Sequence, residues 1–364
     1  MKRLFLFNPE NDIALASGKA GFTPPRNAAE LHRRGAMLLW WLGDSGDGVL
    51  VDERDFEAAV RFGAEAGDLF GDGPEVVADA RGCDVGELVP WGWSANALRQ
   101  FENGGCAVAR EEYGRMDRLR LLSHRRSSVA ISRRLADAAI GVFPPLPKEI
   151  DNPADLAAAI EEWGRVYVKA PWSSTGRGVI CSEGISTDEL LRRSQGTMRR
   201  QGSVLVEKAL DKVVDFAMLF KSDSGNVAFE GYSLFFNGRG SAYGGNLLLP
   251  DEEIERRLAE FVPRELLRRV AETLCDILTE LVGQAYRGRF GVDMMISRDH
   301  SGGFMLAPCV ELNLRLTMGV VAHRLTERIE RFRNKKLIVA PANIVPDGAF
   351  WLVPRNDSYF IGIV

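Results

Sequence analysis

Histidine and cysteine are scarce in this chain, and neither is arranged for catalysis. The 364 residues include four histidines and five cysteines. No two histidines have metal-ligand spacing, no Cys-x-x-Cys pair occurs, and no Gly-x-Ser-x-Gly elbow offers a nucleophilic serine. The scattered, odd-numbered cysteines are typical of a reducing compartment. Acyl transfer through a serine triad is therefore not expected.

A long apolar run and an excess of one charge are also missing. The first apolar run has only four residues before Asn8-Pro9 ends it, which indicates a buried strand rather than a secretion signal. No apolar segment approaches about 20 residues, so no membrane span is expected. The formal net charge is −4, whereas a nucleic-acid partner requires a basic face. We expect a cytoplasmic protein that binds neither a membrane nor a nucleic acid.

A chain of this length, with 46% apolar residues, can bury a substantial core and should divide into two or three domains. Residues 1–115 predict a small doubly wound α/β domain. Its expected elements are a strand at 4–7, a helix near 28–41 and a strand at 48–51.

Two features of this N-terminal domain have alternative interpretations. The loop at 8–12 directly follows the first strand, where open α/β sheets bind ligands, but Asn and Asp also serve as turn and helix-cap residues. Trp91 and Trp93 flank a glycine and either pack in the core or line a pocket wall.

Oxygen-bearing side chains gather near the C-terminal end. Glu311, Asn313 and Arg315 alternate along a strand-like run and should share one face. If the chain folds back through residues 297–303 as a hairpin, Asp293 lies beside Glu311. Carboxylate and amide oxygens suit magnesium, which completes its shell with water and substrate phosphates. The other interpretation is an exposed strand face that meets only water.

A lysine interrupts the apolar run at 165–180. Within a strand, Lys169 needs an anionic partner or a route to solvent. The following Ser/Thr/Gly loop can wrap phosphate oxygens with backbone amides, and Gly176 and Gly178 permit close approach. The loop has neither the Walker nor the dinucleotide spacing, and Gly-x-Gly also occurs in plain hairpin turns.

Another strand-like run, at 203–210, ends in Glu207-Lys208. Its carbonyl, amide and carboxylate groups can face a purine edge and a ribose. A charged residue at the end of an ordinary strand is the alternative interpretation.

The order of these segments resembles the ATP-grasp superfamily over about residues 116–320. The resemblance implies a mixed fold, in which the α/β domain precedes two α+β subdomains that hold a nucleotide between them. It places the ATP-grasp domain at 116–335, with a phosphate-loop subdomain at about 148–206, a metal-site subdomain at about 207–335, and a C-terminal appendage at 336–364.

The resemblance also implies roles for individual residues, with ATP and magnesium, or manganese in its place, as cofactors. The phosphates would meet Lys169, Ser173, Ser174, Thr175, Gly176 and Gly178. The adenine hinge would be Glu207, Lys208, Ala209 and Leu210, and the acid that binds the ribose would be Asp215. The metal ligands would be Asp293, Glu311 and Asn313, and Arg315 would steady the transferred phosphoryl group.

One position departs from the family pattern. The usual phosphate-binding helix lysine is replaced by Arg125-Arg126. Arginine can hold phosphate bidentately, so Arg126 is taken for this role, with Arg125 as the other choice and two solvated arginines as the alternative. The glycine-rich loop after 231–237 could direct Arg239 at a substrate carboxylate or phosphate, or could simply be flexible.

The resemblance implies an ADP-forming ligase that activates a carboxylate as an acyl phosphate and joins it to an amine or thiol. Lys169, Arg239 and Arg315 would be its catalytic residues, and small molecules or peptides its substrates. Such catalysis depends on positioning and charge neutralisation, so it does not require histidine. A small-molecule kinase on the same scaffold and a nucleotide-binding protein without ligase activity are the alternatives.

Overall fold

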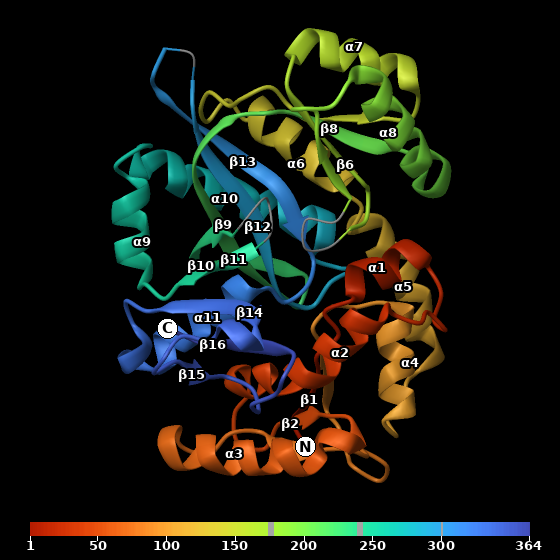
Figure 1. Ribbon diagram of the computed structural model, residues 1–364, viewed down its shortest axis with the longest axis vertical. Coiled ribbons are helices and arrows are strands. Elements are labelled where there is room, and N and C mark those ends of the chain that lie inside the picture. The colour runs from red at the N-terminus through yellow and green to blue at the C-terminus, as the bar shows by residue number, and fades with distance from the viewer. Residues whose placement is uncertain (174–177, 239–242, 300) are drawn as a thin grey trace.

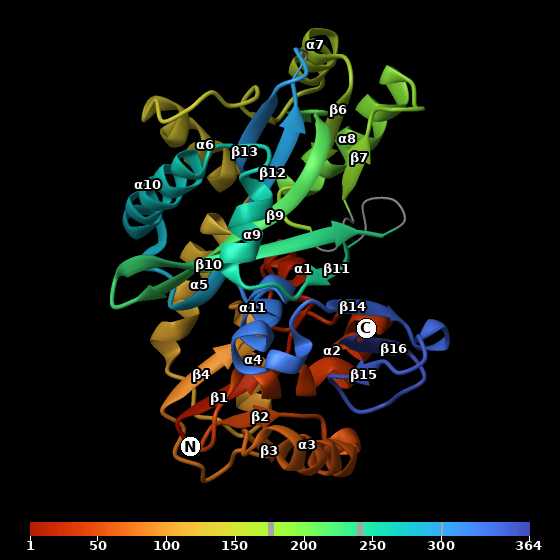
Figure 2. The ribbon, with the colours of Figure 1, turned by 90° about the vertical axis from the view of Figure 1, so that its left-hand side faces the viewer.

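The computed structural model describes residues 1–173, 178–238, 243–299 and 301–364, and these residues form three sheets (Figures 1 and 2). A parallel sheet near the N-terminus, a small antiparallel sheet and a large antiparallel sheet follow one another along the chain. No helix within the described ranges is both long enough and apolar enough to cross a membrane.

The N-terminal sheet has the strand order β3-β2-β1-β4, and all its neighbours pair in parallel. Its topology agrees with the predicted doubly wound unit. The strands are β1 (Arg3–Leu6), β2 (Gly48–Leu50), β3 (Glu75–Val77) and β4 (Glu87–Pro90). The helices are α1 (Asn11–Ser17), α2 (Arg26–Gly35), the 3-10 segments η1 (Ala36–Leu42) and η2 (Glu53–Asp55), α3 (Phe56–Phe70) and α4 (Ala95–Asn103).

The single helix predicted at 28–41 is wrong in its second half. Helix α2 ends at Gly35, and the chain tightens into the 3-10 segment η1. A Cβ atom on Gly35 would lie 2.4 Å from the Phe7 ring, so the backbone passes the first strand too closely for a side chain. All seven residues of η1 are buried, so this segment packs on every side.

The large sheet has the order β13-β12-β9-β10-β11-β14-β16-β15, and its neighbours are antiparallel. Along β9, Phe216, Met218 and Phe220 pack with α10, whereas Ala217 and Leu219 pack with α11 on the opposite face. The strands are β9 (Asp211–Asp223), β10 (Asn226–Asn237), β11 (Tyr243–Leu247), β12 (Gly288–Arg298), β13 (Phe304–Asn313), β14 (Lys336–Pro341), β15 (Phe350–Trp351) and β16 (Tyr359–Ile363).

Helices on both faces of this sheet complete the core. Pro263 precedes the first residue of α10 and lies in the segment that separates it from α9. The Arg-rich region at 117–136 also divides into two helices, α5 and α6, with Ser123 to Arg125 between them. The bounds are α5 (Arg110–Leu122), α6 (Arg126–Asp137), α9 (Asp251–Leu258), α10 (Arg264–Val282), α11 (Met318–Arg328), and the 3-10 segments η3 (Glu330–Phe332) and η4 (Ala342–Ile344).

The small sheet has the order β5-β8-β6-β7 and is antiparallel. Helix α7 begins at Pro153, because the Asn152 side chain accepts from the amide of Asp155 and Pro153 occupies the first turn. The bounds are β5 (Lys148–Ile150), α7 (Pro153–Trp163), β6 (Val166–Lys169), β7 (Val179–Cys181), α8 (Thr187–Gln201) and β8 (Val204–Lys208).

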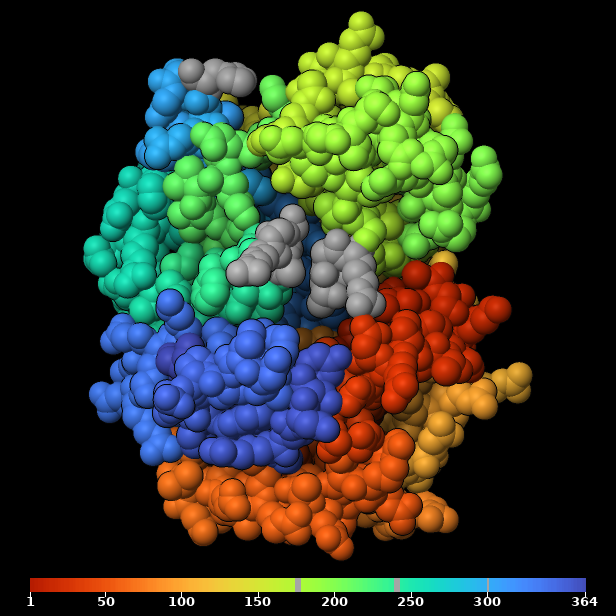
Figure 3. All heavy atoms as spheres, viewed as in Figure 1, coloured from red at the N-terminus to blue at the C-terminus, as the bar shows by residue number. Residues whose placement is uncertain are grey.

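The last strands extend the large sheet, since β14 pairs with β11. They also meet the N-terminal unit: Ser358 Oγ donates to Glu30 at 2.5 Å, and the red and blue segments lie side by side in Figure 3. A second junction joins Gly92 to Arg315 in a β-bridge, and the Leu316 amide donates to the Trp91 carbonyl at 2.7 Å. The N-terminal unit is thereby fixed against the end of β13.

Candidate nucleotide and metal site

The predicted hairpin between β12 and β13 is confirmed, and Asp293 lies directly opposite Glu311 in its register. Asn313 follows two residues later on the same face. All three donors are oxygens, as magnesium requires. No cluster of three or more His, Cys, Asp or Glu side chains suited to a metal occurs in the part of the chain that is described, so this set consists of two carboxylates and one amide.

The two carboxylates differ in their tendency to ionise. Burial and the nearby Glu311 raise the pKa of Asp293 to about 7. Burial also opposes ionisation of Glu311, but Arg125 and Lys169 hold its pKa below the ordinary value. Two crowded carboxylates favour a cation between them, which fits the oxygen donor set.

Arg125 lies at the centre of the site, in the short break between α5 and α6. One of its Nη atoms donates to the Ala170 carbonyl at 2.5 Å and to Ser173 Oγ at 2.6 Å, and the other donates to Glu311 at 2.7 Å. Its buried Nε has no hydrogen-bond partner within the described ranges. An unpaired buried donor is costly, so this atom suits an anionic oxygen such as that of a phosphate.

Arg126, which the sequence favoured for the phosphate role, lies elsewhere. Its Nη2 donates to Glu149 at 2.8 Å, and it lines a separate cavity of about 800 Å³ between α6 and α7. The first residue of helix α6 therefore points away from Glu311, and the structure places Arg125 there instead.

Lys169 is the last residue of β6 and is buried. Its Nζ lies 2.6 Å from the Glu207 carboxylate, at the end of the neighbouring strand β8. The lysine thus has the anionic partner that its position in a strand requires. In the segment 207–210, the amide of Ala209 already donates to the Arg165 carbonyl at 2.8 Å, so Lys208 and Leu210 are better placed to meet a base.

Asp215 lies on β9, where it accepts from Lys212 Nζ at 2.6 Å and from Asn237 at 3.0 Å. Gly178 has φ +77°, which favours glycine, and a Cβ atom there would approach Ala170 Cβ to 3.0 Å. The remaining predicted loop residues lie outside the described residues: Ser174, Thr175, Gly176 and Arg239.

Arg315 is held from two sides. Its Nε lies 3.0 Å from the Asp12 carboxylate, and its Nη2 donates to Asn313 Oδ1 at 3.0 Å. The third contact is from Nη1 to the Leu316 carbonyl at 3.3 Å. An arginine has five N–H donors, so two of them have no partner within the described ranges and could contact a substrate.

Of the loop at 8–12, Asp12 reaches this site. Asn8 exchanges two hydrogen bonds with the backbone of Gly92, and Glu10 is buried against His32 and Gln100. Trp91 packs in the core against Phe7, with ring centres 5.1 Å apart. The loop therefore mainly stabilises the N-terminal unit and presents one carboxylate to the grasp region.

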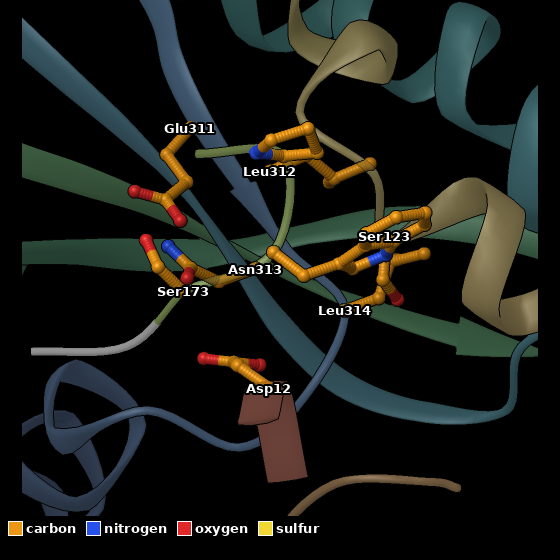
Figure 4. Close-up of a pocket in the computed structure, with 9 residues that line it drawn as sticks. Asp12, Ser123, Ser173, Glu311, Leu312, Asn313 and Leu314 are labelled. Atoms are coloured by element: carbon orange, nitrogen blue, oxygen red, sulfur yellow. The ribbon is translucent and has the colours of Figure 1, made fainter. Parts of the chain in front are cut away.

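A small cavity marks where these segments meet (Figure 4). In that view the carboxylates of Glu311 and Asp12 lie on opposite sides of Asn313 and Ser173. The cavity encloses about 20 Å³, room for about one water-sized group, so it cannot by itself hold a nucleotide. Its lining residues are Asp12, Ser123, Pro171, Trp172, Ser173, Glu311, Leu312, Asn313 and Leu314.

Two members of the site were not predicted from the sequence in their present roles. The contact of Arg125 with Ser173 and Glu311 depends on where α5 ends, and the Asp12 contact with Arg315 depends on a bridge across the whole chain.

Solved structures resemble the whole chain. It superposes on the biotin carboxylase–β,γ-ATP complex of Campylobacter jejuni with a TM-score of 0.51 and 12% identity, covering 100% of this chain and 86% of that one. It superposes on N5-carboxyaminoimidazole synthetase of Staphylococcus aureus complexed with ADP with a TM-score of 0.50 and 12% identity, covering 100% and 93%. No family model matches the sequence, and a search of curated proteins gives no significant match.

Both of those proteins are ATP-grasp enzymes. This chain has an ATP-grasp fold. The mixed α/β fold class predicted from the sequence is confirmed, and the likeness spans the whole chain rather than only about residues 116–320. At 12% identity it concerns the fold, and the activity is a separate question.

Proposed function

We propose that this protein is an ATP- and magnesium-dependent, ADP-forming ligase that joins a carboxylate to an amine. One observation carries the proposal. The β12–β13 hairpin places Asp293 beside Glu311. Arg125 lies in the break between α5 and α6, and it donates hydrogen bonds both to Glu311 and to Ser173, which belongs to the loop proposed to bind phosphate. The site thus combines oxygen ligands for a hard cation with cations for phosphate.

The described residues support a division of roles. Lys169 and Arg125 bind phosphate oxygens, assisted by Ser173 and Gly178. Lys208 and Leu210 present main-chain groups to the base, and Asp215 accepts from the ribose. Magnesium, held by Asp293, Glu311 and Asn313, would neutralise phosphate charge when bound.

The chemistry follows from cations that surround a phosphate without a convincing protein nucleophile. A substrate carboxylate oxygen attacks the γ-phosphorus, the bond to ADP breaks, and an acyl phosphate forms. The two unpaired N–H donors of Arg315 stabilise charge on the transferred group. An amine then attacks the acyl carbon, loses a proton to solvent and expels inorganic phosphate.

The N-terminal unit forms the part of the site that binds the second substrate, the amine. Asp12 lines the cavity next to Asn313 and Glu311, and the rest of its loop is engaged in internal bonds. A protonated amine suits this acidic wall, because it can donate to Asp12 before it is deprotonated. The division into an N-terminal domain, two grasp subdomains and a C-terminal segment belongs to the same proposal.

Isotope transfer tests the reaction class. A substrate pair is first found by magnesium-dependent ADP release from pools of carboxylates and amines. The carboxylate is then labelled with heavy oxygen, and one label should appear in inorganic phosphate for each amide formed. Label retained in a phosphorylated product would instead indicate a kinase, and label in AMP would indicate adenylation; either result contradicts the proposal.

A further inference from the structure

Helix α1 contacts both halves of the candidate site. At its start, Asp12 binds Arg315 at the end of β13. At its other end, the carbonyls of Leu15 and Ala16 accept from the Arg120 side chain, at 2.6 Å from Nε and 3.4 Å from Nη2. A cation at a helix C-terminus offers donors to the last carbonyls, of which that of Leu15 also accepts from the Gly18 amide at 3.2 Å, and it meets the negative end of the helix dipole.

Arg120 also contacts the side chain of Trp172. The Arg120 guanidinium lies 4.2 Å from the centre of the indole ring, within the range of a cation–π contact. The indole Nε1 donates to the Arg120 carbonyl at 3.0 Å, and the His124 ring meets the indole edge-on with centres 4.5 Å apart. Trp172 is therefore fixed to α5 by its ring face and its N–H group together.

Trp172 lies within the segment that is proposed to bind phosphate. Its neighbours Pro171 and Ser173 both bond Arg125, through the Pro171 carbonyl at 3.1 Å and Ser173 Oγ at 2.6 Å. The Trp172 amide donates to Gln201 at 3.0 Å. A displacement of the indole would consequently displace Ser173 relative to Glu311.

We infer that α1 couples the second-substrate side of the protein to its phosphate-binding segment, with Arg120 as the positioning residue. The inference rests on the proposed function, because the segment 170–173 matters to a nucleotide only if a nucleotide binds there. A shift of α1, when a substrate engages Asp12, moves Arg120 and the stacked Trp172 with it. Occupancy of one half of the site thereby changes the geometry of the other.

Variants of two arginines on the same helix test the link. Arg120→Met keeps an alkyl chain over the indole but removes the guanidinium, and Arg118→Met, at an exposed position of α5, is the control. We expect Arg120→Met to increase hydrogen exchange at the Trp172 amide about tenfold and to weaken MgADP binding about tenfold. The thermal midpoint of Arg120→Met should equal that of Arg118→Met. Arg120→Lys, which keeps the charge, should restore part of both losses.

Coupling is tested by adding Asp12→Asn to each background. In the parent this change should alter exchange at Trp172, and in Arg120→Met it should have no further effect. Equal effects in the two backgrounds, or unchanged exchange and affinity in Arg120→Met, would overturn the inference. A parent that fails to bind MgADP would reject the proposed nucleotide site, whereas the exchange measurements would still decide whether α1 and Trp172 are coupled.

Discussion

Asp12 and Arg315 are separated by 303 positions in the sequence and form an ion pair in the structure, with Nε 3.0 Å from the carboxylate. On the side of the proposed metal ligands, Asn313 Oδ1 accepts a hydrogen bond from Nη2 of the same guanidinium at 3.0 Å. The direction of Arg315 is therefore set jointly by the N-terminal unit and by the strand that carries the proposed metal ligands Glu311 and Asn313. Neither unit alone would provide the complete proposed site.

Replacement of each of two adjacent arginines by lysine should separate their roles. Arg125→Lys loses the fork that joins Ala170, Ser173 and Glu311, so MgADP affinity should fall about tenfold or more. Arg126→Lys alters only a half-exposed contact with Glu149 and should bind like the parent. Calorimetric titration with MgADP measures both, and equal losses would show that neither arginine is specific for the site.

Lys169→Ala should weaken ATP binding by about tenfold or more while adenosine binding changes little, because in the proposed site the lysine contacts phosphates and not the base. Lys221→Ala is the control, since Lys221 lies on β9 about 4.0 Å from Asp223 and is well exposed. Competition binding with ATP and adenosine gives both affinities. A loss of the same size for the two ligands would instead indicate damage to β6.

The protein should lose stability in mild acid through His124. Burial, followed by the nearby Arg126, lowers the pKa of this histidine to about 4. The unfolded chain takes up the proton below about pH 6.5, but the native state resists it until about pH 4, so the free energy of unfolding falls as the pH falls through this window. In His124→Asn, whose side chain can still accept from the Arg126 amide, this dependence should shrink. Urea unfolding at a series of pH values gives the comparison, and identical pH profiles would contradict the assignment.

Gly92 has no room for a side chain. A Cβ atom there would lie 2.4 Å from Cγ of Asn11, next to the bonds between Gly92 and Asn8. Gly92→Ala should therefore reduce the free energy of unfolding by about 1–3 kcal/mol. Gly67→Ala, in helix α3 with open space around the site, should raise it by about 0.5–1 kcal/mol. Denaturant unfolding of both variants is the measurement, and a neutral Gly92→Ala would mean that this junction can relax.

Strand alternation made much of the site predictable. The spacing of Glu311 and Asn313 along a strand predicts a common face. The hairpin through residues 297–303 entered the sequence-based prediction only as a condition, and the structure confirms that it brings Asp293 opposite Glu311. Lysine in an apolar strand was equally informative, because such a charge needs a partner, and Glu207 is that partner.

Other parts depended on contacts that no local pattern encodes. Arg125 lies in the break between α5 and α6 and contacts Glu311, whereas Arg126 is the first residue of α6 and contacts Glu149. The helix predicted at 28–41 failed in its second half because the seven residues of η1, 36–42, are all apolar and buried, so they carry no period that distinguishes a 3-10 segment from an α-helix. The domain limits stay predictions.

Calorimetric titration with MgADP is the most direct test of the central claim, that Glu311 and Asn313 lie in a magnesium–nucleotide site. The account predicts that the parent binds MgADP and binds ADP more weakly when the metal is chelated. It also predicts that Glu311→Gln and Asn313→Ala, shown to be folded by their thermal midpoints, lose most of the advantage that magnesium provides. Folded variants that bind MgADP as tightly as the parent would contradict it.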